Sequence, residues 1–239
     1  MKTSDLHLPA GVESHIGDTP DEVAGTLARA VAQRLSDRLA DGGRASLVVS
    51  GGSTPLPFFR ALSSADLDWR RVDVLLADER WLDEDDPASN TRLVKDTLLQ
   101  NNASAACYLS LKQPGATPAD GLAAARSELA SLAWPLDVVI LGMGNDGHTA
   151  SLFPDAPELA RAMDMGGQDV VAAMTPPSQA QKRITLTLPA LLNARYTALH
   201  LKGNDKIATL ERALSEPHEV AAMPIRCFLK PGLQVFWSP

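Results

Sequence analysis

Apolar residues recur with two different periods along the chain, and the two patterns alternate. From Val23 to Leu39 an apolar residue stands at every fourth position, which predicts one face of a helix. Thr19-Pro20-Asp21-Glu22 marks its start, with a capping hydroxyl, a proline at the first helical position and acidic residues that suit the helix dipole. Asp41-Gly42-Gly43 marks its end.

Short apolar runs without polar alternation predict buried strands. Residues 45–49, 72–77 and 136–141 have this pattern, which is typical of parallel strands covered on both faces. The run 182–188 alternates apolar and polar residues and also predicts a strand. Further strands are expected at residues 107–109, 170–173, 196–201 and 233–237.

Helices are expected between these strands. One helix is expected to begin at Pro55. Others are expected at residues 90–99, 118–133, a short stretch around Ala190, and 203–214. Residues 1–18 form a polar lead-in with room for one short edge strand. The alternation of strands and helices predicts an α/β fold, a mostly parallel sheet with helices on both faces. The chain shows no internal repeat and no linker, so we expect residues 1–239 to form a single domain.

A glycine-rich loop, Gly142 to Gly147, follows the strand 136–141 and leads to His148. Open α/β sheets bind ligands at the carboxyl ends of their strands, so we expect this loop to carry the chemistry. The loop matches G-x-G-x-x-G, which suggests a dinucleotide site. That site is rejected because Pro154 and Pro157 cut short the helix that must follow, and no suitable acid ends the next strand.

His148 and Asp146 are the candidate catalytic residues. Histidine side chains titrate near pH 6.5 in peptides, which suits general-base catalysis near neutral pH, and Asp146 can hold the imidazole. No cysteine is close in the sequence, and Ser151 is not part of a G-x-S-x-G motif. These features favour attack by an activated water over a covalent intermediate, although a lone histidine is often merely structural.

A second glycine turn, Ser50-Gly51-Gly52-Ser53-Thr54-Pro55, joins the strand 45–49 to a helix start. Close backbone N–H groups, a helix N-terminus and the hydroxyls of Ser53 and Thr54 suit an anion. The turn lacks the Gly-Lys-Ser/Thr end of a Walker A loop. A plain capped turn is the alternative.

Three cations are candidates for the same anion. Asp78-Glu79-Arg80 ends a predicted strand at the same sheet edge, where Arg80 can bind phosphate and the acids can orient it or face a substrate hydroxyl. Arg183 opens the alternating strand. Lys206 lies in the first turn of a helix, an unfavourable place for a cation without an anionic ligand. A surface ion cluster and a solvated lysine are the alternatives.

Composition restricts the classes of partner and the cellular compartment that we expect. The 239 residues carry a formal net charge of −7, which argues against nucleic acid and anionic membranes as partners. Cys107 and Cys227 are far apart and show no metal-ligand spacing, so we expect no metal and a reducing, cytoplasmic compartment. No apolar run approaches the roughly 20 residues of a membrane span, and we expect no signal peptide at Met1 to Asp5.

Taken together, these motifs resemble the 6-phosphogluconolactonase family. The matching segments are Ser50 to Pro55, Asp78 to Arg80, Gly142 to Pro154 and Arg183 to Thr187, and Asp146 to Pro154 is the most specific. The resemblance implies a modified Rossmann-like fold shared with glucosamine-6-phosphate deaminase and ribose-5-phosphate isomerase. It also implies hydrolysis of 6-phospho-D-glucono-1,5-lactone to 6-phospho-D-gluconate, in the oxidative pentose phosphate pathway, without a cofactor.

The resemblance further implies a role for each site residue. His148 activates the water that attacks C1 of the lactone, and Asp146 supports the histidine. Backbone N–H groups of residues 142–147 are plausible oxyanion donors. The partner is a small phosphorylated lactone, and we expect a monomer or a weak homodimer. The residues that would gather around the 6-phosphate are Gly51, Gly52, Ser53, Thr54, Arg80, Arg183 and Lys206.

Two other functions stay open. The deaminase relatives carry a glutamate five residues after the histidine, where this chain has Phe153, and an Asp-Glu-Tyr where it has Asp78-Glu79-Arg80. Both differences favour the lactonase. A non-catalytic sugar-phosphate sensor would carry a helix-turn-helix segment first, but only about 18 residues precede the first long helix, and a sensor has no need of His148.

Overall fold

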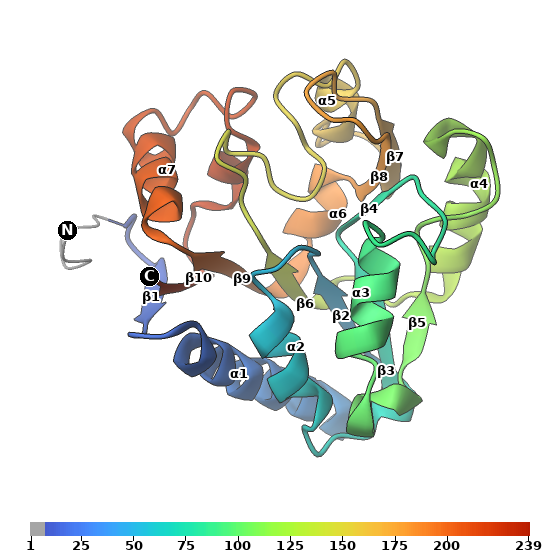
Figure 1. Cartoon of the computed structure of the whole chain (residues 1–239), viewed down its shortest axis with the longest axis vertical. Coiled ribbons are helices and arrows are strands. Elements are labelled where there is room, and N and C mark those ends of the chain that lie inside the picture. Colours follow the sequence, from blue (N-terminus) through green and yellow to red (C-terminus); the bar gives the residue numbers. More distant parts are fainter. Residues whose placement is uncertain (1–7) are drawn as a thin grey trace.

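A parallel sheet forms the centre of the molecule in the computed structural model, which describes residues 8–239 (Figure 1). Every strand pairing in this sheet is parallel. The expected mostly parallel sheet is therefore confirmed, whereas the lead-in residues 1–7 lie outside the described part. The strands in spatial order are β1 (Glu13–Ile16), β10 (Leu233–Ser238), β9 (Ala194–Lys202), β6 (Leu136–Leu141), β2 (Ala45–Val49), β3 (Val72–Leu76) and β5 (Cys107–Leu109).

Helices cover both faces of this sheet. α1 (Pro20–Ala40) contacts β2, β6 and β10, while α6 (Leu188–Leu192) contacts β6 from the other side (Figure 1). The side chain of Thr19 accepts a hydrogen bond from the Glu22 N–H, and Pro20 opens α1, as the sequence predicts. The central strands β2, β3 and β6 are buried along their whole length, which explains why all but one residue of each is apolar.

The remaining helices follow the predicted order with small shifts. α4 (Pro118–Glu128) is shorter than the predicted helix 118–133, because a 3-10 turn begins at Leu129. Sequence patterns did not predict α5. No helix within residues 8–239 combines the length and apolar character needed to cross a membrane. The remaining bounds are α2 (Leu56–Ser63), α3 (Asn90–Thr97), α4 (Pro118–Glu128), α5 (Leu159–Ala162) and α7 (Asn204–Ser215).

A second, antiparallel sheet was not predicted. Its strands, in order, are β4 (Asp78–Arg80), β8 (Arg183–Leu186) and β7 (Val171–Met174). Residues 78–80, expected at the end of the parallel strand 72–77, therefore form a separate strand of this second sheet. Ala77 is the junction: its N–H donates to Val49 O of β2, while its C=O accepts from Leu186 N of β8, both at 2.8 Å. The chain passes from one sheet to the other at this residue.

β2 and β6 part at their carboxyl ends. Their pairing stops at Val48 and Val139, and beyond it the Ser50 hydroxyl donates to Ile140 O at 3.1 Å and accepts from Gly142 N at 3.3 Å. β3 lies on one side of β2 and β6 on the other, so the strand order reverses here. Such a switch point is where open α/β sheets bind ligands.

At the opposite edge of the sheet, a buried carboxylate joins three elements. Asp137 on β6 is 5% exposed and accepts a hydrogen bond from Ser46 N of β2 at 2.9 Å. Its Oδ1 lies 3.2 Å from Arg38 Nε of α1 and 3.3 Å from Arg195 Nε of β9. A carboxylate is tolerated at this depth because guanidinium groups and hydrogen bonds compensate for its lost hydration.

We expect Asp137→Asn to lower the free energy of unfolding by about 2–4 kcal/mol, because two guanidinium groups lose their counter-charge. Urea unfolding followed by circular dichroism measures the change. Asp41→Asn is the control, since the Asp41 side chain is 74% exposed and its carboxylate lies 3.9 Å from Arg38 Nη1. That variant should change stability by less than about 0.5 kcal/mol. Equal losses in the two variants would contradict this account.

Candidate active site

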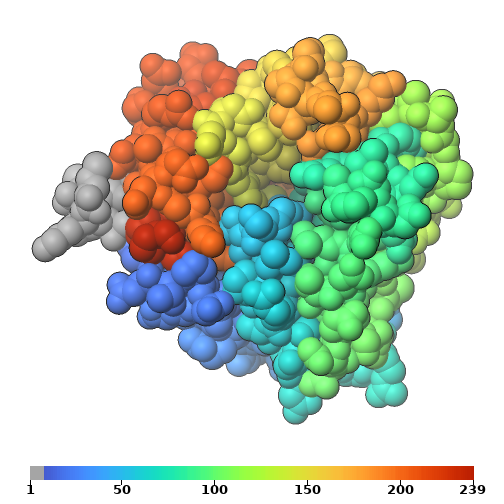
Figure 2. Space-filling view, in the orientation of Figure 1, coloured from blue at the N-terminus to red at the C-terminus, as the bar shows by residue number. Residues whose placement is uncertain are grey.

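A cavity of about 300 Å³ opens where β2 and β6 part. Its walls come from the glycine turn after β2, the loop after β6, the strands β4 and β8, and the start of α7. Figure 2 shows the surface hollowed between the segment around residues 50–60 and the yellow segment around residues 145–155. Of the predicted site residues, all line this cavity except Ser53 and Asp146.

The glycine turn forms one wall of the cavity. Gly51, Gly52 and Thr54 line it, and α2 begins directly afterwards. Gly51 is packed so closely against Asn90 that a Cβ at this position would lie 2.0 Å from Asn90 Oδ1. Glycine is therefore needed for the turn to reach α3. Ser53, by contrast, is exposed and lies outside the cavity wall.

The loop after β6 folds back to present His148. Gly147 N donates to Gly144 O at 3.0 Å, and Gly144 N donates to His148 O at 2.9 Å. Asp146 Oδ1 then lies 2.6 Å from His148 Nδ1 and accepts from the His148 backbone N–H at 3.1 Å. An ionised Asp146 holds the proton on Nδ1, which leaves Nε2 free to act as a base.

Asp146 is ionised at neutral pH. Partial burial raises its pKa, but the hydrogen bonds and positive charge of His148 outweigh that effect, so the pKa falls below its ordinary value. A carboxyl group with a lowered pKa stabilises the folded chain above its unfolded pKa of about 4. This contribution disappears as the pH falls through the lower folded value. At neutral pH Asp146 therefore orients the imidazole as a carboxylate.

Two arginines face each other across the second sheet. The register of β4 and β8 pairs Arg80 directly with Arg183, and both side chains line the cavity. Arg80 Nη1 donates to Ala88 O and Arg183 Nη2 donates to Gln179 Oε1, each at 3.1 Å. The Nε of each arginine is buried and has no hydrogen-bond partner among residues 8–239. Like charges opposite one another weaken a strand pair, so this arrangement favours an anion between them.

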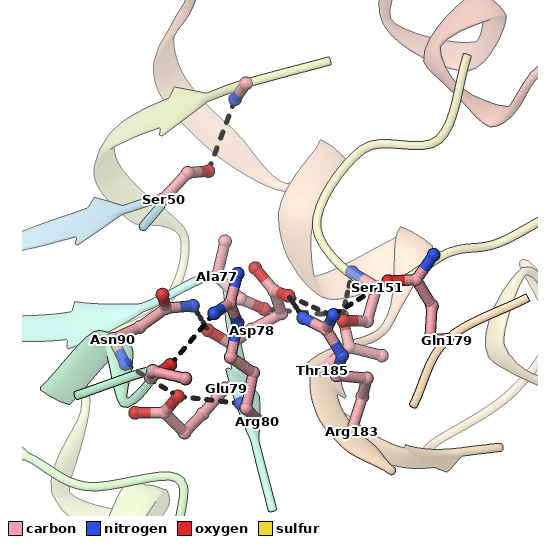
Figure 3. Close-up of polar contacts among 12 residues, drawn as sticks. Ser50, Ala77, Asp78, Glu79, Arg80, Asn90, Ser151, Gln179, Arg183 and Thr185 are labelled. Atoms are coloured by element: carbon pink, nitrogen blue, oxygen red, sulfur yellow. Dashed lines mark hydrogen bonds and ion pairs between the residues drawn. The ribbon is translucent and has the colours of Figure 1, made fainter. Parts of the chain in front are cut away.

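Asp78 lies beside the two guanidinium groups (Figure 3). Its Oδ2 accepts a hydrogen bond from the Ser151 hydroxyl and lies 3.8 Å from Arg183 Nη1. Burial lowers the pKa of Arg183, the charge of Asp78 partly offsets this, and Arg80 adds to it. Arginine stays protonated in proteins even so. One carboxylate next to two guanidinium groups leaves this part of the cavity positively charged.

Glu79 points away from the cavity and fixes the backbone instead. Glu79 is 1% exposed, and hydrogen bonds to its carboxylate connect β4 with the start of α3. A carboxylate at a helix N-terminus is stabilised by the free N–H groups there. Within the Asp-Glu-Arg motif, Asp78 and Arg80 line the cavity, whereas Glu79 has a structural role. The donors to Glu79 are the N–H groups of Arg80, Asn90 and Thr91 and the hydroxyls of Ser89 and Thr91.

Lys206 lines the cavity from α7, as predicted. Its Nζ donates to Asn145 Oδ1 and lies 3.9 Å from a carboxylate oxygen of Asp205. Arg212, farther along α7, donates to the backbone O of Asn145. Hydrogen bonds from α7 therefore hold Asn145, in the loop that carries the His148–Asp146 pair.

The cavity wall also contains polar residues that the sequence motifs did not reveal, among them Asn90, Gln179 and His200. Asn90 Nδ2 donates to Asp78 O at 3.3 Å, next to Arg80 in Figure 3. None of the three belongs to a recognisable motif. For His200 the available signal was its place near the carboxyl end of a predicted strand. Within residues 8–239 no group of three or more His, Cys, Asp or Glu side chains is arranged to hold a metal.

The fold and the cavity define an α/β protein with a ligand site at the switch point of a parallel sheet. The chain belongs to the family of glucosamine-6-phosphate isomerases and 6-phosphogluconolactonases, whose profile matches residues 18–237. It is 44% identical to a 6-phosphogluconolactonase of Pseudomonas aeruginosa over 100% of both chains. It is 43% identical to one of Rhizobium meliloti over 94% of this chain and 98% of that one.

A solved structure has nearly the same fold. The crystal structure of a 6-phosphogluconolactonase from Shewanella baltica aligns with a TM-score of 0.93 at 43% identity, covering 98% of this chain and 100% of that chain. The resemblance noted in the sequence motifs is therefore confirmed at the level of the family and the fold.

The close contact between Gly144 and His148 gives a test of the loop geometry. A Cβ at Gly144 would lie 2.2 Å from the His148 ring, so Gly144→Ala must displace the imidazole. We expect kcat to fall by about 100-fold or more, the usual contribution of a general base, while the melting temperature changes little. Enzyme kinetics and thermal unfolding measure the two effects.

Gly142→Ala is the matched control, because a Cβ there meets nothing within 4 Å. Since Gly142 lines the cavity, any effect of this variant should fall on KM and leave kcat near the normal value. Unchanged kcat in Gly144→Ala would show that the position of His148 does not depend on this glycine.

Proposed function

We propose that this chain hydrolyses 6-phospho-D-glucono-1,5-lactone to 6-phospho-D-gluconate. The observation that carries the proposal is the cross-strand pair Arg80 and Arg183 in the same cavity as the His148–Asp146 pair. The first pair suits a phosphate and the second suits activation of water. Relatives that are 43–44% identical and are named 6-phosphogluconolactonase support the same substrate.

The phosphate end of the lactone binds among cations and a glycine turn. Arg80 and Arg183 supply guanidinium donors, Lys206 supplies an ammonium group, and the turn at Gly51 and Gly52 supplies backbone N–H groups. Asp78 holds Arg183 in place through its charge and accepts from Ser151. These contacts place the lactone ring toward the loop that carries His148.

Hydrolysis then needs one base and no cofactor. His148 Nε2 takes a proton from water as the water oxygen attacks C1, and Asp146 stabilises the imidazolium that forms. The tetrahedral intermediate collapses with cleavage of the bond between C1 and the ring oxygen. His148 returns its proton to that oxygen, which becomes the hydroxyl of the open-chain acid.

The oxyanion donor follows from the hydrogen bonds of the loop. The N–H groups of Gly142, Gly144 and Gly147 already donate within the described protein. Met143 lines the cavity, and no hydrogen bond involves its N–H among residues 8–239. We assign the Met143 N–H to the oxyanion on C1, where a positioned donor stabilises the developing charge.

The alternatives fit the site less well. Phe153, which stands where the deaminases carry a glutamate, is 1% exposed and packs its ring 4.0 Å from the His148 ring. It supplies no acid for a ring-opening isomerisation. A sensor needs no ordered His–Asp pair. The two free cysteines agree with the expected cytoplasmic location.

The lactone can be generated in situ by oxidation of glucose 6-phosphate, and its opening followed by acid release. The purified protein should open it faster than spontaneous hydrolysis without added metal. His148→Ala should lower kcat by roughly 10²–10⁴-fold, because the base is lost. A rate equal to the protein-free control, with or without a divalent metal, would overturn the proposal. Normal turnover in His148→Ala would remove that residue from its role.

Arg80→Ala tests the phosphate site. We expect kcat/KM for the phosphorylated lactone to fall by roughly 10–100-fold, the value of a charged hydrogen bond, with little change for plain glucono-1,5-lactone. Arg161→Ala is the control, because the Arg161 side chain is 77% exposed and pairs with Asp169 outside the cavity. If Arg80→Ala keeps the preference for the phosphorylated substrate, Arg80 does not bind phosphate.

A further inference from the structure

His200 is a buried polar residue for which the proposed mechanism gives no role. It lies in β9 between Leu199 and Leu201, is 6% exposed, and still lines the cavity. Its ring meets Phe58 of α2 edge-on, with 6.1 Å between the ring centroids. Burial lowers the pKa of His200 to about 4, so the imidazole is uncharged at neutral pH.

The two ring nitrogens of His200 have different surroundings. Nδ1 is fully buried and has no hydrogen-bond partner in the described part of the chain. Nε2 has no hydrogen-bond partner within residues 8–239 either, but it is not among the fully buried unpartnered atoms. Nε2 is thus the nitrogen that the cavity leaves accessible. An uncharged imidazole carries one N–H, and a buried N–H without a partner is rarer than a buried acceptor without one. The proton therefore belongs on Nε2.

The cavity that His200 lines also includes residues at two helix starts. Pro55, directly before α2, is one of them. Lys202 and Lys206, which flank the start of α7, are the others. Both helix N-termini and both lysines favour an anion, and the donor at Nε2 adds a directional contact among them.

We propose that His200 determines specificity, by donating a hydrogen bond from Nε2 to an oxygen of the phosphate group of the substrate. This proposal rests on the proposed function, since it deepens the recognition of the same substrate. An uncharged donor also has a physical advantage here. It adds a bond to the anion without adding to the repulsion among Arg80, Arg183 and Lys206 in the free protein.

Two variants of similar volume separate this role from packing. His200→Gln keeps an N–H donor near the position of Nε2, whereas His200→Leu removes both nitrogens. We expect His200→Leu to raise KM for the phosphorylated lactone by roughly 5–20-fold, with kcat nearly unchanged, because one hydrogen bond to an anion is lost. His200→Gln should stay within about 3-fold of the wild-type KM. The rate with plain glucono-1,5-lactone should not change in either variant.

Thermal unfolding supplies a second readout. His200→Leu should raise the melting temperature, because it removes a buried nitrogen without a partner. A purely structural histidine predicts the opposite, a lower melting temperature with parallel losses for both substrates. That result, or an unchanged KM in His200→Leu, overturns the proposal.

Binding of inorganic phosphate distinguishes failure of this proposal from failure of the proposed function. In ¹⁵N spectra of the histidine side chains, phosphate should shift the Nε2 resonance of His200, assigned by its loss in His200→Gln. A missing shift overturns the role of His200, whatever the enzyme activity. A clear shift in a protein that does not open the lactone overturns the proposed function and leaves the phosphate contact standing.

Discussion

The parting of β2 and β6 is the constraint on which the rest of the site depends. Parallel strands that stay paired to their ends leave no space between them. Here the ladder stops at Val48 and Val139. Beyond it, the hydroxyl of Ser50, which follows β2, bonds to Ile140 O of β6 and to Gly142 N directly after β6. The two glycine-rich segments that follow can then diverge and enclose a cavity. One serine hydroxyl thereby keeps the opening without leaving buried backbone groups unpaired.

The charges in this opening repel one another and so destabilise the folded chain. Arg80 and Arg183 are opposed across a strand pair, and the buried Nε of each has no hydrogen-bond partner within the described residues. Asp78 compensates for only one of them. The surrounding structure tolerates this because Glu79, in the same short strand, is held by a full set of donors at the start of α3. Repulsion at a site can persist where the surrounding structure is rigid.

The sequence predicted those parts of the molecule whose signals are local. An apolar residue at every fourth position and the Thr19 cap predicted α1. Short, mostly apolar runs predicted β2, β3 and β6. The second sheet was missed because β4 is three polar residues long and pairs with a strand about a hundred residues later. Local patterns cannot register such pairing. His148 and Arg80 were found through motifs, whereas Gln179 and His200 enter the cavity only through tertiary packing.

Ala77 has a consequence for how the protein opens. Because its N–H belongs to one sheet and its C=O to the other, neither sheet can fray at this point without breaking a bond of its neighbour. The amides around Ala77 and Leu186 should thus exchange with solvent only through large-scale unfolding. The far side of the cavity is held by the exposed side-chain bonds from Lys206 and Arg212 to Asn145, which break at much smaller free energies. The arginines thus lie in the part of the cavity wall that sheet hydrogen bonds hold, and the loop with His148 lies in the part that exposed side-chain bonds hold.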